Sequence, residues 1–439
     1  MSGFVVENRI FDPAETMLRG DLEALQSSKL RETVKRVQQV PFYKKAFSQN
    51  GINPDQIRTL DDLRRLPFTT KADLRNEYPQ RMLAVDRAEV ARYHGSSGTT
   101  GKPTMVAYTQ NDLKTWANLC ARFLTGGGMR PEHCVQIAFG YGLFTGGFGL
   151  HYGVEHIGAS VIPAAAGNTP KQIMLMMDMQ VDTLVCTPSY ALTISEFIIQ
   201  NDIPRSAINL KHAHFGGEPW TEDMRARIEE ELGILCFNNY GLSEVIGPGV
   251  SGECAARDGM HIAEDAFIVE CIHPETLEPV APGEQGELVF TSLSKEAMPI
   301  IRYRTRDIAS INPDPCACGR TGVRMSRVTG RSDDMLIVKG VNVYPSQIEQ
   351  ALLRVKGTAP HYLIEVDRPD RTDVVTVKVE MTEKSFSASM KEMQELKDRI
   401  DRAIQGITGL RMQIELVSPN SLERFVGKAQ RVIDHRQQT

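Results

Sequence analysis

The spacing of hydrophobic residues predicts that the chain begins with helices. Leu22, Leu25, Leu30 and Val34 recur at near-helical intervals, and Pro41 interrupts this pattern. We therefore expect the first 80 residues or so to be mainly helical, with a break at the proline.

Short apolar runs alternate with amphipathic stretches through the middle of the chain. Residues 181–186 are predicted to form a buried strand that ends at Thr187-Pro188, and residues 206–215 repeat the pattern before Gly216-Gly217. Strands that alternate with helices indicate an α/β fold with substantial parallel pairing.

The last 110 residues or so have a different pattern. Residues 375–379 alternate between apolar and polar, as in a half-exposed strand, and residues 414–417 predict another short strand. Apolar residues between 393 and 404 mark one face of a helix, and 346–355 is a further helix candidate. These elements predict a small α+β domain.

The length supports two domains, because 439 residues exceed what one hydrophobic core usually serves. The change of pattern places the boundary within residues 330–334. We expect a large N-terminal domain of mixed sheets and helices over residues 1–332 and a small, mobile C-terminal domain over residues 333–439.

Composition and charge exclude several classes of protein. The hydrophobic fraction of 41% and the charged fraction of 24% are typical of a soluble globular protein. A net charge of −5 gives no basic footprint for nucleic acid. No apolar run reaches the roughly 18 residues of a membrane span, and residues 1–15 lack the pattern of a secretory signal. With only eight cysteines, reduced thiols and a cytoplasmic location are expected.

Residues 93–104 concentrate groups that can bind phosphate. Backbone N–H groups and hydroxyls of such a loop can point at phosphate oxygens, and Lys102 adds a positive charge. It is not a Walker loop, because five residues separate Gly95 from Gly101 and Pro103 follows the lysine. A flexible surface turn is the alternative. The predicted phosphate-binding residues are Ser96, Ser97, Gly98, Thr99, Thr100, Gly101 and Lys102.

This loop resembles the phosphate loop of the adenylate-forming superfamily, which includes acyl-CoA synthetases and nonribosomal adenylation domains. Four later segments resemble the other motifs of the superfamily in the same order: 238–244, 303–307, 330–333 and 427–428. Five ordered motifs are far more specific than any one of them. The resemblance implies transfer of AMP from ATP, with Mg²⁺, to a carboxylic acid.

The resemblance also implies a role for individual residues. Tyr240 would stack near adenine, Ser243 would meet the α-phosphate, and Glu244 would bind Mg²⁺. Asp307 would hold the ribose, since its two oxygens can accept from two neighbouring hydroxyls. Lys428 would be the catalytic lysine, near the acyl carboxylate and the α-phosphate.

Other residues follow from the same resemblance. Asp333 would be the hinge about which the small domain rotates between two half-reactions. Lys339 and Gly340 would face the pantetheine channel of coenzyme A. The remaining predicted cofactor-binding residues are Gly217, Glu218, Pro219, Asn239, Gly241 and Arg331.

Within the superfamily the chain most resembles the phenylacetate–CoA ligase family over essentially its full length. The strings that carry this resemblance include residues 66–74, 140–147, 217–220 and 339–345. It implies ATP-dependent thioesterification of an aromatic or similar acid, and commonly a homodimer.

The sequence leaves two kinds of acid open. Phe139, Tyr141, Phe144 and Gly216 are the predicted substrate residues, and close backbone packing is an equal explanation for the glycines between 140 and 153. The family pattern has tyrosine where Phe139 stands and alanine where Gly217 stands. A small branched or 2-hydroxy acid, such as 2-hydroxyisobutyrate, is therefore the alternative to phenylacetate.

Cys254, His261, Cys316 and Cys318 form a candidate structural zinc site. Three cysteines and a histidine are a standard zinc set and leave no open position for catalysis. The C-x-C spacing is tighter than usual, and unrelated thiols are the alternative.

Three rival classes stay open. An adenylating enzyme that loads a carrier protein would share the motifs but would not consume coenzyme A. The failed Walker spacing counts against a P-loop phosphotransferase. Glu244, Asp307 and Lys428 count against a non-catalytic nucleotide- or zinc-binding protein.

Overall fold

The N-terminal region is helical, as predicted. The computed structural model describes residues 6–96, 103–338, 341–369, 373–423 and 431–438. Helices α1 (Arg19–Val37) and α2 (Pro41–Gln49) are followed by two short 3-10 helices and then by α3 (Lys71–Asn76). The predicted break at Pro41 is present, since α1 ends at Val37 and Pro41 begins α2, where the first turn needs no hydrogen bond from the N–H that proline lacks.

The main sheet has nine strands in the order β13-β14-β9-β8-β7-β6-β5-β3-β4. Its parallel half contains β3 (Cys134–Ile137), β4 (Ser160–Ile162), β5 (Thr183–Cys186), β6 (His212–Phe215) and β7 (Leu235–Leu242). Its antiparallel half contains β8 (Gly247–Glu253), β9 (Met260–Ile262), β13 (Ile311–Asn312) and β14 (Arg324–Met325). The predicted parallel pairing is confirmed. The strand predicted from residue 206 starts at His212, because a 3-10 turn occupies Arg205–Ala207.

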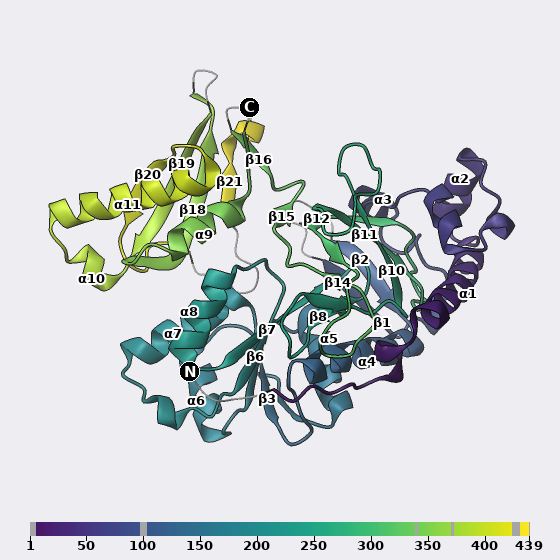
Figure 1. Cartoon of the computed structure of the whole chain (residues 1–439), viewed down its shortest axis with the longest axis horizontal. Coiled ribbons are helices and arrows are strands. Elements are labelled where there is room, and N and C mark those ends of the chain that lie inside the picture. The colour runs from purple at the N-terminus through teal and green to yellow at the C-terminus, as the bar shows by residue number, and fades with distance from the viewer. Residues whose placement is uncertain (1–5, 97–102, 339–340, 370–372, 424–430, 439) are drawn as a thin grey trace.

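Helices accompany the parallel strands along the chain (Figure 1). These helices are α4 (Gln110–Gly126), α5 (Thr145–Ile157), α6 (Thr169–Asp178), α7 (Pro188–Gln200) and α8 (Glu222–Leu232). A second, antiparallel sheet contains β10 (Phe267–Ile272), β11 (Gly286–Ser292), β12 (Tyr303–Ala309) and β15 (Gly330–Arg331). A separate hairpin pairs β1 (Arg92–Ser96) with β2 (Thr104–Tyr108).

Residues 336–438, here called the C-terminal unit, have their own sheet and hydrophobic core (Figure 1). The order β20-β19-β18-β21 joins strands Gln413–Val417, Val374–Met381, Thr358–Asp367 and Val432–Asp434. Its other elements are β16 (Leu336–Val338), β17 (Val341–Val343), α9 (Pro345–Leu353), α10 (Glu383–Phe386) and α11 (Met390–Thr408). The α+β character of this region matches the prediction. A domain boundary between residues 332 and 333 stays a prediction.

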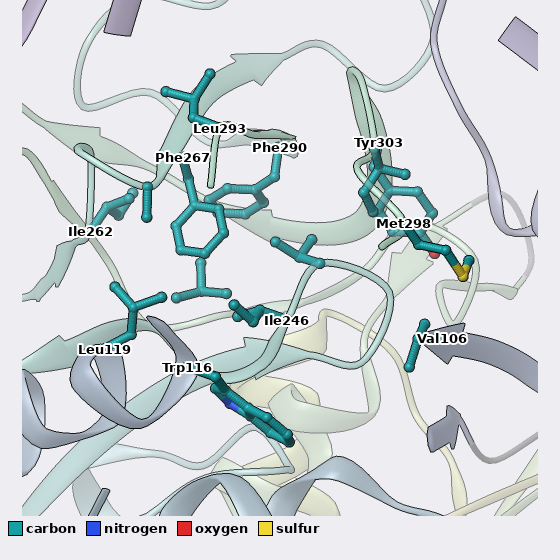
Figure 2. Packing of buried hydrophobic residues seen from close by; sticks show 14 of the residues in the cluster. Val106, Trp116, Leu119, Ile246, Ile262, Phe267, Phe290, Leu293, Met298 and Tyr303 are labelled. Carbon is teal, nitrogen blue, oxygen red and sulfur yellow. The ribbon is translucent and has the colours of Figure 1, made fainter. Parts of the chain in front are cut away.

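The largest hydrophobic core lies between α4 and the two sheets of the N-terminal part. Figure 2 shows Trp116 of α4 below Ile246, with Phe267 and Phe290 of the second sheet above them. Within the described part of the chain, no helix has both the length and the apolar character that a bilayer span requires.

Glycines of α5 allow this helix to approach α4 closely. A Cβ at Gly149 would lie 2.4 Å from Trp116, and one at Gly153 would lie 2.5 Å from the Cβ of Cys120. Close packing therefore explains these two glycines. It does not explain Gly140 or Gly142, where an added Cβ would meet no heavy atom within 4 Å.

We predict that Gly153→Ala destabilises the protein, whereas Gly146→Ala in the same helix does not. The extra methyl at position 153 must push α4 and α5 apart, which should lower the free energy of unfolding by about 1–3 kcal/mol. A Cβ at Gly146 would be no closer than 3.7 Å to its nearest neighbour, Phe139. Urea unfolding of the three proteins measures the difference, and equal midpoints for both variants would contradict the packing argument.

Candidate active site

The predicted phosphate loop connects the strands of the β1–β2 hairpin. Ser96 at the end of β1 pairs with Thr104 at the start of β2, so the two ends of the loop are held side by side. The Ser96 and Thr104 hydroxyls are buried and have no hydrogen-bond partner in the described structure. Buried hydroxyls without partners are unfavourable unless a ligand satisfies them. The predicted residues from Ser97 to Lys102 lie outside the described residues.

The second motif forms the end of β7 and the turn into β8. A Cβ at Gly241 would lie 2.0 Å from the carbonyl oxygen of Gly247, so this tight approach requires glycine. The Ser243 hydroxyl lies 2.9 Å from that of Thr145, the first residue of α5. The Glu244 carboxylate is buried and lies 3.6 Å from the Lys71 ammonium.

Lys71 reaches Glu244 because its helix is anchored to the second sheet. Residues Thr69 and Tyr303 form a β-bridge, and Thr70 then caps α3, whose first residue is Lys71. Lys71 lies in one of the segments that resemble the family, residues 66–74, but no role was predicted for it. Only the fold brings it to Glu244, which is 173 positions later.

A chain of polar contacts joins the motifs around Tyr240, Asp307 and Arg331. The Tyr240 hydroxyl donates to Oδ2 of Asp307 at 2.7 Å, and the Arg331 guanidinium donates to Oδ1 at 2.9 Å. Burial and the neighbouring Asp307 carboxylate raise the pKa of Tyr240 well above its usual value, so it stays a donor. Arg331 also pairs with the exposed Asp333 at 2.9 Å.

Lys295 is a buried cation that the sequence analysis missed. Its side chain is 3% exposed, and its Nζ lies 4.5 Å from the centre of the Tyr108 ring, with no hydrogen-bond partner in the described structure. The loop that contains Lys295 is held by Asp112, whose carboxylate accepts from the backbone N–H groups of Glu296 and Ala297. Burial lowers the pKa of Lys295 to about 8, against the attraction of Asp112 and Glu244.

The predicted acyl-binding segments meet at Phe139. An added Cβ at Gly217 would lie 3.5 Å from the Phe139 ring, so the end of β3 and the loop after β6 are neighbours. Gly216 packs tightly against Asn239, whose side-chain amide donates to the Phe215 carbonyl at 2.7 Å. The acyl segments and the nucleotide motif are therefore adjacent.

Further predicted residues near this region have other partners. The Tyr141 hydroxyl lies 3.1 Å from Nδ1 of His151, and Phe144 is 51% exposed. Glu218 accepts from the backbone N–H of Ser189 at 2.7 Å, and Pro219 is exposed. Lys339, Gly340 and Lys428 lie outside the described residues.

The four predicted metal ligands come together at one place. The Sγ atoms of Cys254 and Cys316 are 3.8 Å apart, and Sγ of Cys318 lies 3.3 Å from Nε2 of His261. All four ligand atoms lie within 4.8 Å of one another. Zn–S bonds of about 2.3 Å in a tetrahedron separate two sulfurs by roughly 3.8 Å, so the donor set fits zinc.

The fold also orients the histidine of this cluster. Nδ1 of His261 lies 3.3 Å from the carbonyl oxygen of Gly322, and a hydrogen bond there leaves Nε2 facing the sulfurs. His261 belongs to β9, which pairs with β14. The loop that carries Cys316 and Cys318 leads directly into β14, so it lies beside His261. The short C-x-C spacing therefore allows Cys316 and Cys318 to bind the same metal ion as His261.

Comparison with known proteins identifies the family. The model "AMP-binding enzyme" matches residues 16–294, and "AMP-binding enzyme C-terminal domain" matches residues 340–436. The phenylacetate-coenzyme A ligase of Escherichia coli (strain K12) is 46% identical over 98% of this chain and 99% of that protein. The chain belongs to the phenylacetate–CoA ligase family of AMP-binding enzymes. This membership confirms the predicted family and enzyme class, an AMP-forming acid–thiol ligase.

Solved structures confirm the predicted fold class. A crystal structure of 2-hydroxyisobutyryl-CoA ligase in the postadenylation state is 28% identical, with a TM-score of 0.91 over 98% of this chain and 95% of that chain. The same ligase in the thioesterification state gives a TM-score of only 0.71 over 98% and 96%. The arrangement of the parts in this chain is therefore more similar to that of the ligase in its postadenylation state.

We predict that Lys295→Met stabilises the protein at pH 7. Lowering the pKa from 10.5 to about 8 corresponds to a cost of about 3 kcal/mol for the charged form, which methionine removes. The folded protein releases this proton before the unfolded chain does, so the advantage of the variant should shrink as pH rises from 8 to 10. Unfolding experiments at pH 7 and 10 test this, with the exposed Lys171→Met as control. A variant that is less stable at pH 7, or a pH-independent gain, would contradict it.

Proposed function

We propose that the protein is a phenylacetate–CoA ligase that makes phenylacetyl-AMP from ATP and then transfers the acyl group to coenzyme A. The observation that carries this proposal is the near full-length 46% identity to a phenylacetate-coenzyme A ligase. The hydrogen bond from Tyr240 to Asp307 and the ion pair between Lys71 and Glu244 support it.

The chemistry explains why such a site needs concentrated charge. A carboxylate is a poor electrophile, because its charge is delocalised and it would have to expel oxide. Transfer of AMP turns it into a mixed anhydride with a good leaving group, which the thiol of coenzyme A can displace. The first step gathers the negative charges of ATP and the acid, so fixed cations must stabilise it.

In this proposal the described residues divide the binding of ATP among them. Asp307 accepts from the ribose hydroxyls, because the two oxygens of a carboxylate can accept from two neighbouring hydroxyls. Tyr240 lies beside adenine, and the orphan hydroxyls of Ser96 and Thr104 lie at the base of the phosphate loop. Asn239, Gly241 and Arg331 are also proposed to bind the nucleotide.

The phosphates are balanced by cations from three parts of the chain. In this proposal Lys71, which lies 3.6 Å from Glu244, the buried Lys295 and Lys102 of the phosphate loop supply the positive charge. Glu244 would hold Mg²⁺, which supplies charge neutralisation at the phosphates when bound. Ser243, fixed by Thr145, faces the α-phosphate.

Lys428 is the proposed catalytic residue for AMP transfer, where it contacts the acyl carboxylate and the α-phosphate. The C-terminal unit would then rotate about Asp333 and bring Lys339 and Gly340 to the pantetheine channel. The exposed position of Asp333 beside Arg331 suits a hinge. A homodimer is part of the same proposal.

Phenylacetate is preferred over 2-hydroxyisobutyrate as the acid. The ligase for the smaller acid is 28% identical to this chain, against 46% for the phenylacetate ligase. Phe139, Tyr141, Phe144 and Gly216 are the residues proposed to border the acid.

The decisive test is acid-dependent release of AMP from a panel of carboxylic acids. The panel should include phenylacetate and 2-hydroxyisobutyrate, each with and without coenzyme A. We expect the highest kcat/KM with phenylacetate, and coenzyme A consumption equal to AMP release. Lys428→Ala should lose about 100-fold or more in adenylation but retain thioester formation from supplied phenylacetyl-AMP.

Three results would change the proposal. Higher kcat/KM with 2-hydroxyisobutyrate would replace the substrate, and AMP release without coenzyme A consumption would favour a carrier-protein ligase. No acid-dependent AMP from any acid would overturn the function.

We also propose that Cys254, His261, Cys316 and Cys318 bind one structural Zn²⁺ through a Cys₃His set. The cluster ties the loop after β13 to the N-terminal segment, because the Asn8 side chain donates to the Cys318 carbonyl and Arg320 pairs with Glu15. Zinc would thus hold the chain's beginning against the main sheet.

Purified protein should contain about one zinc per chain, and Cys316→Ser should lose it. Loss of the metal should lower the free energy of unfolding by several kcal/mol, because metal binding is coupled to folding. Cys134→Ser, a change outside the cluster, should keep both the metal and the stability. Wild-type protein that purifies without zinc, together with a Cys316→Ser variant as stable as wild type, would dismiss the site.

A further inference from the structure

An ion pair is buried where the parallel half of the main sheet meets the antiparallel half. Strand β7 pairs in parallel with β6 on one side and antiparallel with β8 on the other. Arg225 of α8 donates to both carboxylate oxygens of Glu253, the last residue of β8, at 2.9 and 2.7 Å. The two side chains are 8% and 6% exposed. Paired hydrogen bonds between desolvated charges fix the distance and the angle between the helix and the strand.

Both members of this ion pair also bind the backbone of β7. The Glu253 carboxylate accepts from the N–H of Asn238 at 2.7 Å, and the Arg225 guanidinium donates to the carbonyl of Cys236 at 3.1 Å. Asn238 is the first residue of the second motif, residues 238–244. The ion pair therefore holds the strand that leads into this motif.

The same guanidinium holds residues 216–220, here called the β6 loop because they follow β6. It lies 4.9 Å from the centre of the Trp220 ring, and the Phe215 ring lies 5.4 Å from that ring. Trp220 is 4% exposed, and its indole N–H has no hydrogen-bond partner in the described structure. Ring contacts therefore hold Trp220, with Arg225 as the cation. The β6 loop contains the predicted site residues Gly216 to Pro219.

Stability alone does not explain a buried ion pair at this place. Desolvation of two charges costs about as much as their attraction returns, so a well-packed neutral pair of similar volume is often as stable or more stable. A neutral pair lacks the fixed geometry of two charge-assisted bonds. Arg225 contacts β7, β8 and the β6 loop at once, so this one side chain sets their relative positions.

We propose that Arg225 and Glu253 are positioning residues that hold the β6 loop against the second motif, so that the acid and ATP are bound in the right relative position for AMP transfer. This inference rests on the proposed function. The two segments approach closely, because a Cβ at Gly216 would lie 2.6 Å from the side-chain oxygen of Asn239. A small shift of the β6 loop therefore disturbs both binding sites, and misplacement of reactants is costly in rate.

The test is the double variant Arg225→Met/Glu253→Gln, which removes both charges and keeps an acceptor for the Asn238 N–H. Its urea midpoint should be no lower than that of wild type, because no buried charge is left unpaired. The KM values for ATP and for phenylacetate in acid-dependent AMP release should each rise at least about fivefold. A merely structural role would lower the folded fraction, which reduces the apparent kcat but leaves KM unchanged.

A second variant and a readout without catalysis keep the test independent of folding. Arg225→Lys retains the buried cation but lacks the planar fork that binds both oxygens of Glu253, so both KM values should again rise. The chain has two tryptophans, and Trp116 lies in the core, where its indole N–H donates to the Pro248 carbonyl at 2.7 Å. Acrylamide quenching of tryptophan fluorescence should therefore increase in both variants through Trp220, and the increase should vanish when Trp220→Phe is added.

The matched control is Arg227→Met/Glu231→Gln, an ion pair of 2.8 Å on the same helix that is directed at α7, where Ser195 donates to Glu231. It should keep both KM values within about twofold of wild type and leave the quenching unchanged.

Two results would overturn the role of the Arg225–Glu253 pair. One is unchanged KM values in the double variant or in Arg225→Lys, and the other is an equal rise of KM in the control. Wild-type protein without acid-dependent AMP release would instead reject the proposed function itself. The quenching comparison would then decide whether the ion pair holds the β6 loop.

Discussion

The carboxylate of Asp307 is the contact on which the arrangement of the site depends. It accepts from Tyr240 of β7 through one oxygen and from Arg331 of β15 through the other, while its own strand, β12, belongs to the second sheet. One side chain thus joins the main sheet, the second sheet and the segment that leads into the C-terminal unit. Charge-assisted bonds to a buried carboxylate are short and directional, so they fix these three elements more firmly than apolar packing would. A nucleotide bound at Asp307 would contact all of them at once.

Three buried polar groups lower the stability of the fold. The Lys295 ammonium and the Ser96 and Thr104 hydroxyls have no hydrogen-bond partner in the described structure. Unpaired buried polar groups cost stability, and they persist where a ligand needs them. The apolar core beneath, with Trp116 stacked on Tyr108 at 4.9 Å, supplies the rigidity that keeps these groups in place.

Local patterns in the sequence predicted much of the fold and part of the site. The alternation at residues 375–379 was sufficient to predict a strand, and the helical spacing at 393–404 was sufficient to predict a helix. Each pattern depends on one element alone. The predicted break at Pro41 was confirmed, because α1 ends at Val37 and the proline begins the next helix, α2. Gly149 and Gly153 of α5 pack on α4, whereas an added Cβ at Gly140 or Gly142 would meet no heavy atom within 4 Å, and a sequence pattern cannot separate the two cases. The roles of Ser97 to Lys102, Lys339, Gly340 and Lys428 stay predictions.

The sequence alone determined the family, the order of the motifs and the identity of the four candidate zinc ligands. These depend on residue types and spacings, which the chain displays directly. Only the tertiary structure decided that Lys71 meets Glu244, that Lys295 is buried with no hydrogen-bond partner among the described residues, and that Tyr240 donates to Asp307. The physical reason is that a charge acts through distance and burial, and both are set by segments far apart in the chain.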